Sequence, residues 1–329
     1  MKPLPVAAVC LGLALLTFFR YPGHTWLQQD TQIYLPILEH QRDPAALRND
    51  ILAQQPHVAF TLYDEVSRGL RAVTGQAFRE VLAAQQVATR ALGIWGFFLM
   101  ATALGLNAGP AFVVAAICGL GATITGPQVL SFEYEPTPRA FAVPLIFCAM
   151  GLAARRRHLA AAIAAACAFL YHPPTALPFW ALFVVVLVLR RRLWALAPLL
   201  IAALVLALMA HGDGGQAFFG RLTPLQEQLQ RMRTPYSWIS TWHTAWIVNY
   251  CLLFAIAAAA LAKFVASLEN AGKVGGLAAG RAKRATKPRP LAPGPRPHFH
   301  PAVSRFDTPA ERCRWNWSSF SWAFQFSAC

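Results

Sequence analysis

The sequence is poor in charge and rich in apolar residues. Asp, Glu, Lys and Arg make up 13% of its 329 residues, and only 14 residues are acidic, whereas 56% are hydrophobic. A soluble domain usually carries about 25% charged residues. Several apolar runs approach the roughly 20 residues that a helix needs to cross a bilayer. The composition therefore predicts an all-α, multi-span membrane protein.

Several functional signatures are missing. No CxxC pair and no Cys/His metal spacing occurs, so neither a disulfide framework nor a zinc site is indicated. There is no phosphate-binding loop, no dinucleotide fingerprint and no Ser-His-Asp signature. The predicted spans hold no charged residue in their interiors, which argues against an ion pump or a proton-relay transporter.

The apolar runs predict a bundle of about eight transmembrane helices. Their ranges are 4–20, 91–106, 109–126, 139–154, 158–171, 174–189, 193–210 and 244–262. Arginine triplets at 155–157 and 190–192 mark cytoplasmic loops by the positive-inside rule. This orientation predicts a multi-pass protein of the bacterial inner membrane, with the N-terminus and the C-terminal tail in the cytoplasm. Segments 21–90, 127–138 and 211–243 then lie outside.

Two domains are predicted, a membrane domain over 1–262 and a tail over 263–329. The tail contains 11 Lys or Arg and 3 Asp or Glu and is rich in Pro and Gly, so disorder is expected. Its basic run favours anionic lipid headgroups over nucleic acid as a partner. Two origins stay open for it: a native tail, or translation out of frame after about residue 267, which would leave a truncated protein.

The first outer segment contains a helical pattern over 57–90. Apolar residues recur at helical spacing, which predicts amphipathic helices at the membrane surface. Asp64 and Glu65 fall on the polar part of this pattern and are expected to be solvated. His57 has no partnered motif.

Asp30 and a short acidic segment are the candidate chemical residues. Asp30 follows the first apolar run by about ten residues, where a carboxylate can act as a base, bind a cation, or cap a helix that starts at Thr31. The segment from Phe132 to Arg139 holds two carboxylates, Glu133 and Glu135, on one face if it is extended. Such a pair can hold a divalent ion, and Arg139 suits a phosphate. A solvated turn is the alternative.

His172 lies at a break between two apolar runs, in LYHPPTALPF. An imidazole at this position can bind phosphate, move a proton or ligate a metal, or it can simply satisfy backbone groups. The sequence leaves these roles open.

The layout resembles the GT-C superfamily of integral-membrane glycosyltransferases, which includes the protein mannosyltransferases and the aminoarabinose transferases. The resemblance covers about residues 1–262 and includes an early outer-loop acidic residue, here Asp30 in QQDTQIY. It implies a polyprenyl-phosphate sugar donor and, in some members, a divalent cation. Glu133 and Glu135 would match the second acidic position of the family.

From this resemblance we expect sugar transfer to an extracytoplasmic acceptor, with Asp30 as the general base. Arg139, His172 and Tyr34 would contact the substrate, and Glu133 and Glu135 would hold the cation or position the acceptor. Partners would be the bilayer and the lipid-linked donor. Two rival hypotheses are a non-enzymatic carrier of a lipid-linked substrate and an inactive truncated protein.

Overall fold

The computed structural model describes most of the chain up to residue 263. The described residues are 3–28, 30–58, 61–121, 130–212, 222–235, 238–260 and 262–263. The chain divides into two compact units, Met1–Ala255 and Ile256–Cys329. The description below concerns the first unit. The predictions of a disordered tail and of a frame change near residue 267 fall on 264–329, outside the described residues.

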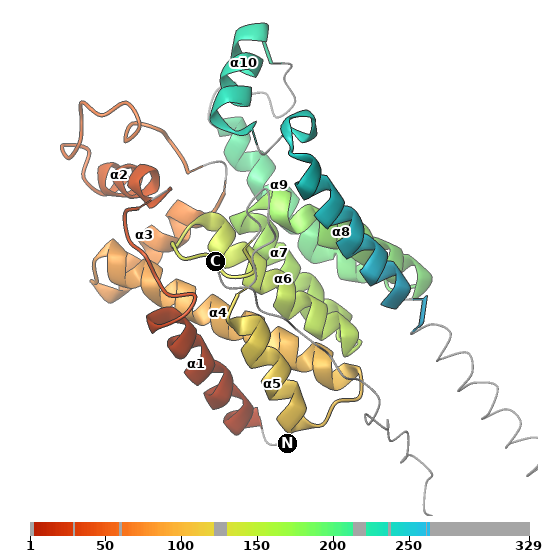
Figure 1. The fold of residues 1–329 in the computed structure, drawn as a ribbon. Coiled ribbons are helices and arrows are strands. Elements are labelled where there is room, and N and C mark those ends of the chain that lie inside the picture. Colours follow the sequence, from red (N-terminus) through yellow and green to blue (C-terminus); the bar gives the residue numbers. More distant parts are fainter. Residues whose placement is uncertain are drawn as a thin grey trace, which may run out of the picture. The chain divides into compact units, whose positions relative to one another are not determined.

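The first unit is built from helices joined by turns and extended segments (Figure 1). The helices are α1 (Pro3–Phe19), α2 (Thr31–Arg42), α3 (Tyr63–Thr74), α4 (Phe78–Ala103), α5 (Ala108–Gly119), α6 (Pro138–Ala154), α7 (His158–Tyr171), α8 (Pro173–Leu189), η1 (Leu193–Leu196), α9 (Ala197–Gly212), α10 (Pro224–Arg233) and η3 (Ile239–Thr241). Residues 244–255 are helical as well. The all-α part of the predicted fold is therefore confirmed.

The helices α4 and α6 form the centre of the unit. On one side α1 and α5 pack against α4, and on the other side α7 packs against α6 and carries α8 and α9 (Figure 1). Glycines permit the close approach: a Cβ added to Gly96 of α4 would lie 2.2 Å from the main-chain oxygen of Phe147. Gly151 of α6 faces Gly96 in the same way, with 2.4 Å between its added Cβ and the Gly96 oxygen. Neither position has room for a side chain.

Small residues and one large aromatic fill the α6–α9 core. α7 buries alanines along one face, and Trp180 of α8 packs on them, with its indole N–H donating to the Ala165 carbonyl at 3.2 Å. A second apolar cluster lies between α1, α4 and α5, and a third joins α2, α3 and the start of α6. The third cluster lies below the candidate site.

The prediction of a membrane-spanning bundle is wrong. Among the helices of the described segments, none is both long enough and apolar enough to cross a membrane. α1, α6 and α8 have 17 residues each, so each is about 26 Å long against a hydrocarbon core of roughly 30 Å. α4 has 26 residues, but its first half carries polar and charged side chains such as Gln86 and Arg90. The predicted multi-pass localisation in the inner membrane is corrected with it.

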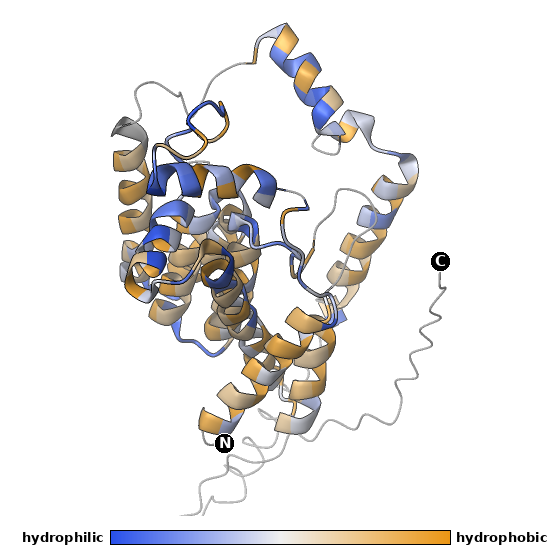
Figure 2. Ribbon diagram, turned by 90° about the vertical axis from the view of Figure 1, so that its left-hand side faces the viewer, coloured by the Kyte–Doolittle hydropathy of each residue, from blue (hydrophilic) through white to orange (hydrophobic). Residues whose placement is uncertain are grey.

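The high apolar content is divided between the interior and the surface. Large apolar side chains are exposed on α1, α8 and α9, including Leu16, Leu182 and Leu200. Figure 2 shows long hydrophobic stretches, in orange, along the helices. The apolar runs were correctly placed as helices. The ranges predicted for α1, α6, α7 and α8 agree with these helices to within a residue at each end.

Candidate functional site

The segment that follows α5 is tied to the start of α2 by Glu135. This carboxylate is 3% exposed. Its Oε1 accepts a hydrogen bond from the Gln28 N–H at 2.6 Å, and its Oε2 accepts one from the Thr31 N–H at 3.1 Å. A carboxylate at a helix N-terminus satisfies otherwise unpaired N–H groups and is favoured by the helix dipole. Glu135 therefore fixes the head of α2 from a distant part of the chain.

Asp30 stands at the N-cap of α2 but does not cap it. Its backbone is helical, with φ −64° and ψ −24°, and its side chain makes no capping hydrogen bond. The residue is exposed. Burial, and then the nearby Asp30 carboxylate, raise the pKa of Tyr34 to about 12, while Arg139 acts in the opposite direction. The charges of Asp30 and Arg139 therefore both act on the Tyr34 phenol, in opposite directions.

Glu133 and Arg139 form an ion pair at the start of α6. The Arg139 Nε lies 2.7 Å from Glu133 Oε1, and the two side chains are 45% and 7% exposed. Burial raises the pKa of Glu133 and the Arg139 guanidinium opposes the rise, with Asp30 and Glu135 adding to it. Because the Arg139 side chain is 45% exposed, part of it faces solvent. Glu133 thereby orients a cation at the surface.

His172 caps the helix that follows it. Its Nδ1 accepts a hydrogen bond from the Thr175 N–H at 3.3 Å and lies 2.7 Å from the Thr175 hydroxyl oxygen. Burial and then Arg139 lower the pKa of His172. With Nδ1 as an acceptor, the neutral ring carries its proton on Nε2. The residue therefore both caps α8 and keeps one N–H available near Arg139.

Contacts thus tie Glu135 to the head of α2 and Glu133 to Arg139, and the charges of Asp30 and Arg139 both act on Tyr34. Asp30 and Tyr34 come from α2, Glu133 and Glu135 from the segment before α6, and Arg139 from α6 itself. Glu135 serves the α2 head and Glu133 serves Arg139, so both carboxylates already have partners within the chain. That these two glutamates hold a divalent ion stays a prediction.

Buried polar side chains hold the main chain of the segment that carries Glu133 and Glu135. The Tyr63 hydroxyl donates to the Pro136 carbonyl at 2.8 Å, and Arg90 of α4, 1% exposed, donates to the Glu133 carbonyl at 2.6 Å. Burial raises the pKa of the Tyr63 phenol well above its ordinary value, so it remains a donor. The segment that carries the two glutamates is therefore fixed along its main chain.

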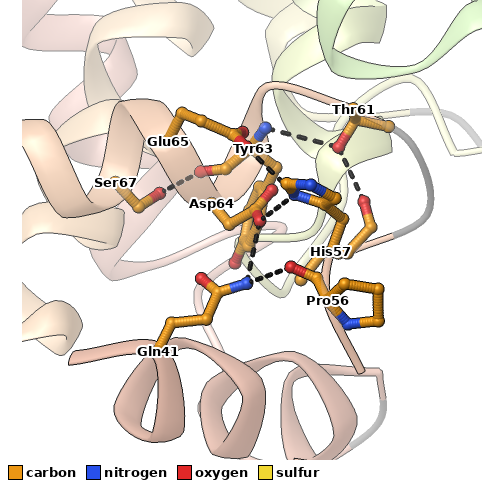
Figure 3. Close-up of polar contacts among 9 residues, drawn as sticks. Gln41, Pro56, His57, Thr61, Tyr63, Asp64, Glu65 and Ser67 are labelled. Atoms are coloured by element: carbon orange, nitrogen blue, oxygen red, sulfur yellow. Dashed lines mark hydrogen bonds and ion pairs between the residues drawn. The ribbon is translucent and has the colours of Figure 1, made fainter. Parts of the chain in front are cut away.

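A second cluster was not predicted from the sequence. His57 Nδ1 lies 3.0 Å from Asp64 Oδ2 and 3.0 Å from Glu65 Oε1 (Figure 3). One ligand atom from each of the three side chains can be chosen so that all lie within 4.8 Å of one another. Asp64 was expected to be solvated, but its side chain is 0% exposed. Desolvation, and then Asp64, raise the pKa of Glu65 to about 7.

The face of α3 that turns inward explains why this cluster was missed. Tyr63, Asp64 and Ser67 are the buried residues of α3, whereas Leu70 and Val73 are 39% and 86% exposed. The apolar pattern pointed to the opposite face. The one available signal was His57, seven positions before Asp64, and spacing alone does not identify such a pair.

A cavity of about 630 Å³ borders this second cluster. Glu65 and Gln41 contribute to its wall, together with three arginines, Arg42, Arg68 and Arg71. Arg42 is paired with Glu39 at 2.7 Å, and the Arg71 guanidinium lies over the Phe78 ring at 4.7 Å. The cavity gives solvent and ions a route to Glu65.

Comparison of the chain with protein family models, with curated proteins and with solved structures found no match. The resemblance to the GT-C superfamily therefore rests on the residues of this chain alone.

Proposed function

We propose that the face formed by Asp30, Tyr34, Arg139 and His172 transfers a sugar from a polyprenyl-phosphate donor to an acceptor hydroxyl. The observation that carries the proposal is the position of Asp30. Its carboxylate is exposed and makes no capping hydrogen bond, while Glu135 accepts from the Thr31 N–H at the head of α2. The charges of Asp30 and Arg139 both act on Tyr34. An exposed carboxylate that shares its surroundings with a guanidinium suits proton abstraction beside a phosphate.

Each of these residues has a separate role in the proposed reaction. Asp30 takes the proton of the acceptor hydroxyl as its oxygen bonds to the anomeric carbon. The bond between that carbon and the phosphate oxygen breaks, and the lipid phosphate leaves with the electron pair. The outer nitrogens of Arg139 and the Nε2–H of His172 donate to the phosphate oxygens, where negative charge develops. Glu133 holds Arg139 in position.

The proposal is tested with polyprenyl-phosphate-linked mannose and glucose presented in detergent micelles. Release of polyprenyl phosphate is the readout, because it reports transfer to any acceptor, water included. Asp30→Asn should lower this release by at least about 100-fold with donor affinity retained, since a positioned base contributes about that much. Glu80→Gln, an exposed carboxylate on α4, is the matched control and should leave release unchanged.

The outcomes separate this proposal from its rivals. Donor binding without release, unchanged in Asp30→Asn, would indicate a carrier and overturn the enzymatic role. Loss of donor binding in Arg139→Lys, with the same free energy of unfolding, would support the phosphate contact, because Lys cannot reproduce the planar guanidinium fork. If neither donor binds, the proposal fails.

A further inference from the structure

We propose that His57, Asp64 and Glu65 form a binding site for a divalent transition-metal ion of the Zn²⁺ or Mn²⁺ type. The site lies on α3 and the segment before it, and it shares no residue with the proposed sugar-transfer face. It therefore stands or fails independently of that proposal.

The donor set fits such an ion. One imidazole nitrogen and two carboxylates suit Zn²⁺ and Mn²⁺, whereas Mg²⁺ prefers oxygen ligands and water. The nitrogen lies 3.0 Å from an oxygen of each carboxylate. Ligand atoms of a tetrahedral zinc ion with ordinary bond lengths are separated by roughly 3.3 Å. The three side chains therefore need only small shifts to share one ion.

Two carboxylate oxygens of the cluster lack hydrogen-bond partners, as expected for oxygens that can ligate a cation. Asp64 is 0% exposed, yet its Oδ1 is buried without a hydrogen-bond partner, and so is Glu65 Oε2. Figure 3 shows the two carboxylates and the His57 ring facing one another. Buried polar atoms without hydrogen-bond partners are costly. The His57 ring and the Gln41 amide both reach Asp64 Oδ2, which leaves Asp64 Oδ1 and Glu65 Oε2 without a donor. A dication would neutralise both carboxylates at once.

The surroundings supply support for the ligands and access for the ion. The Gln41 amide donates to Asp64 Oδ2 at 3.0 Å and to the Pro56 carbonyl at 2.8 Å (Figure 3). Such outer contacts orient metal-binding carboxylates. Glu65 is part of the wall of the cavity described above, so an ion can enter from solvent. Three protein ligands leave a coordination position open.

The test uses the full chain after dialysis against a chelator. Titration calorimetry with ZnCl₂ and MnCl₂ should show a saturable site that MgCl₂ occupies more weakly. His57→Gln and Glu65→Gln should each weaken Zn²⁺ binding by at least about tenfold, since loss of even an outer-shell partner costs that much. Thermal unfolding of both variants in chelator should match the parent, which excludes misfolding as the cause.

Two controls account for other zinc ligands in the chain. His243→Gln removes an exposed histidine elsewhere, and the pair His298→Gln and His300→Gln removes the two histidines of the tail. All should bind Zn²⁺ as the parent does. If the His57 and Glu65 variants also bind unchanged, or if the tail variant alone loses binding, the site is overturned. It is likewise overturned if the parent binds no ion and the carboxylates share a proton instead.

Discussion

The Glu135 carboxylate accepts a hydrogen bond from the Thr31 main-chain nitrogen at 3.1 Å, across 104 positions of sequence. This contact links the segment before α6 to the first turn of α2. It also explains how Asp30 occupies an N-cap position while its own side chain stays out of the cap. Glu135 therefore caps α2, and the Asp30 carboxylate is not used for capping.

Glu135→Gln should destabilise the protein by about 1–3 kcal/mol, because one of two charge-assisted hydrogen bonds to the α2 head is lost from a buried position. Asp30→Asn, one residue from the same helix start, should change the free energy of unfolding by less than about 0.5 kcal/mol. Urea unfolding of both variants measures the difference. Equal destabilisation would show that Asp30 takes part in capping after all.

Arg90 provides the second tie to this segment. Its NH2 group donates to the Gly23 carbonyl at 2.8 Å and to the Glu133 carbonyl at 2.6 Å, and burial lowers the pKa of Arg90 to about 10. Arg90→Met should destabilise the protein by at least about 1 kcal/mol, because two hydrogen bonds are lost and, of their acceptors, only the Glu133 carbonyl keeps another donor, the Gln86 amide. Arg79→Met, at an exposed position of the same helix, is the control for chemical denaturation. A parent-like Arg90→Met would mean that the relief of burying a charge offsets both bonds.

The helices were the most predictable part of this fold. The ranges 139–154 and 158–171 agree with α6 and α7 to within a residue, because an arginine triplet and a proline interrupt otherwise continuous apolar runs. The lengths of the helices, rather than their positions, decide against membrane spans among the described residues. α5 ends at Gly119, although the apolar run continues into Leu120, and residues 122–126 of the predicted range lie outside the described residues.

The candidate sites were predictable only in part. Asp30, Glu133 and Arg139 stand out in sequence because polar residues are rare around them, and the structure brings them to one face. Asp64 could not be recognised, since its burial depends on which face of α3 turns inward. That face is set by tertiary contacts such as the Tyr63–Pro136 hydrogen bond rather than by the apolar pattern.

Replacement by alanine should have opposite effects at two glycines, because Gly96 lies in the contact between α4 and α6 and Gly12 of α1 lies outside it. Gly96→Ala should cost more than about 2 kcal/mol, because its Cβ would meet the Phe147 main chain, which cannot give way as a side chain can. Gly12→Ala in α1 has no atom within 4 Å of the added Cβ and should stabilise by about 0.5–1 kcal/mol through helix propensity. Thermal unfolding distinguishes them. If Gly96→Ala is tolerated, the two helices do not approach this closely.

His172 predicts a pH dependence of stability. Its folded-state pKa lies below the ordinary value of 6.5 through burial and then Arg139. Between the two values the unfolded chain binds more protons, so the free energy of unfolding rises with pH up to about 6.5 and is lost as pH falls below it. His172→Asn keeps an N-cap acceptor for Thr175, so at neutral pH it should stay within about 1 kcal/mol of the parent. Below about pH 6.5 the free energy of unfolding of His172→Asn should change less steeply with pH than that of the parent.

Urea unfolding at a series of pH values from about 5 to 7.5 measures this slope in parent and variant. His243→Asn changes an exposed histidine and should keep the parent's slope, which separates a specific effect of His172 from a general loss of titratable charge. An unchanged slope in His172→Asn would show that the pKa of the His172 ring is the same in the folded and unfolded chains, so that burial and Arg139 do not disfavour its protonation.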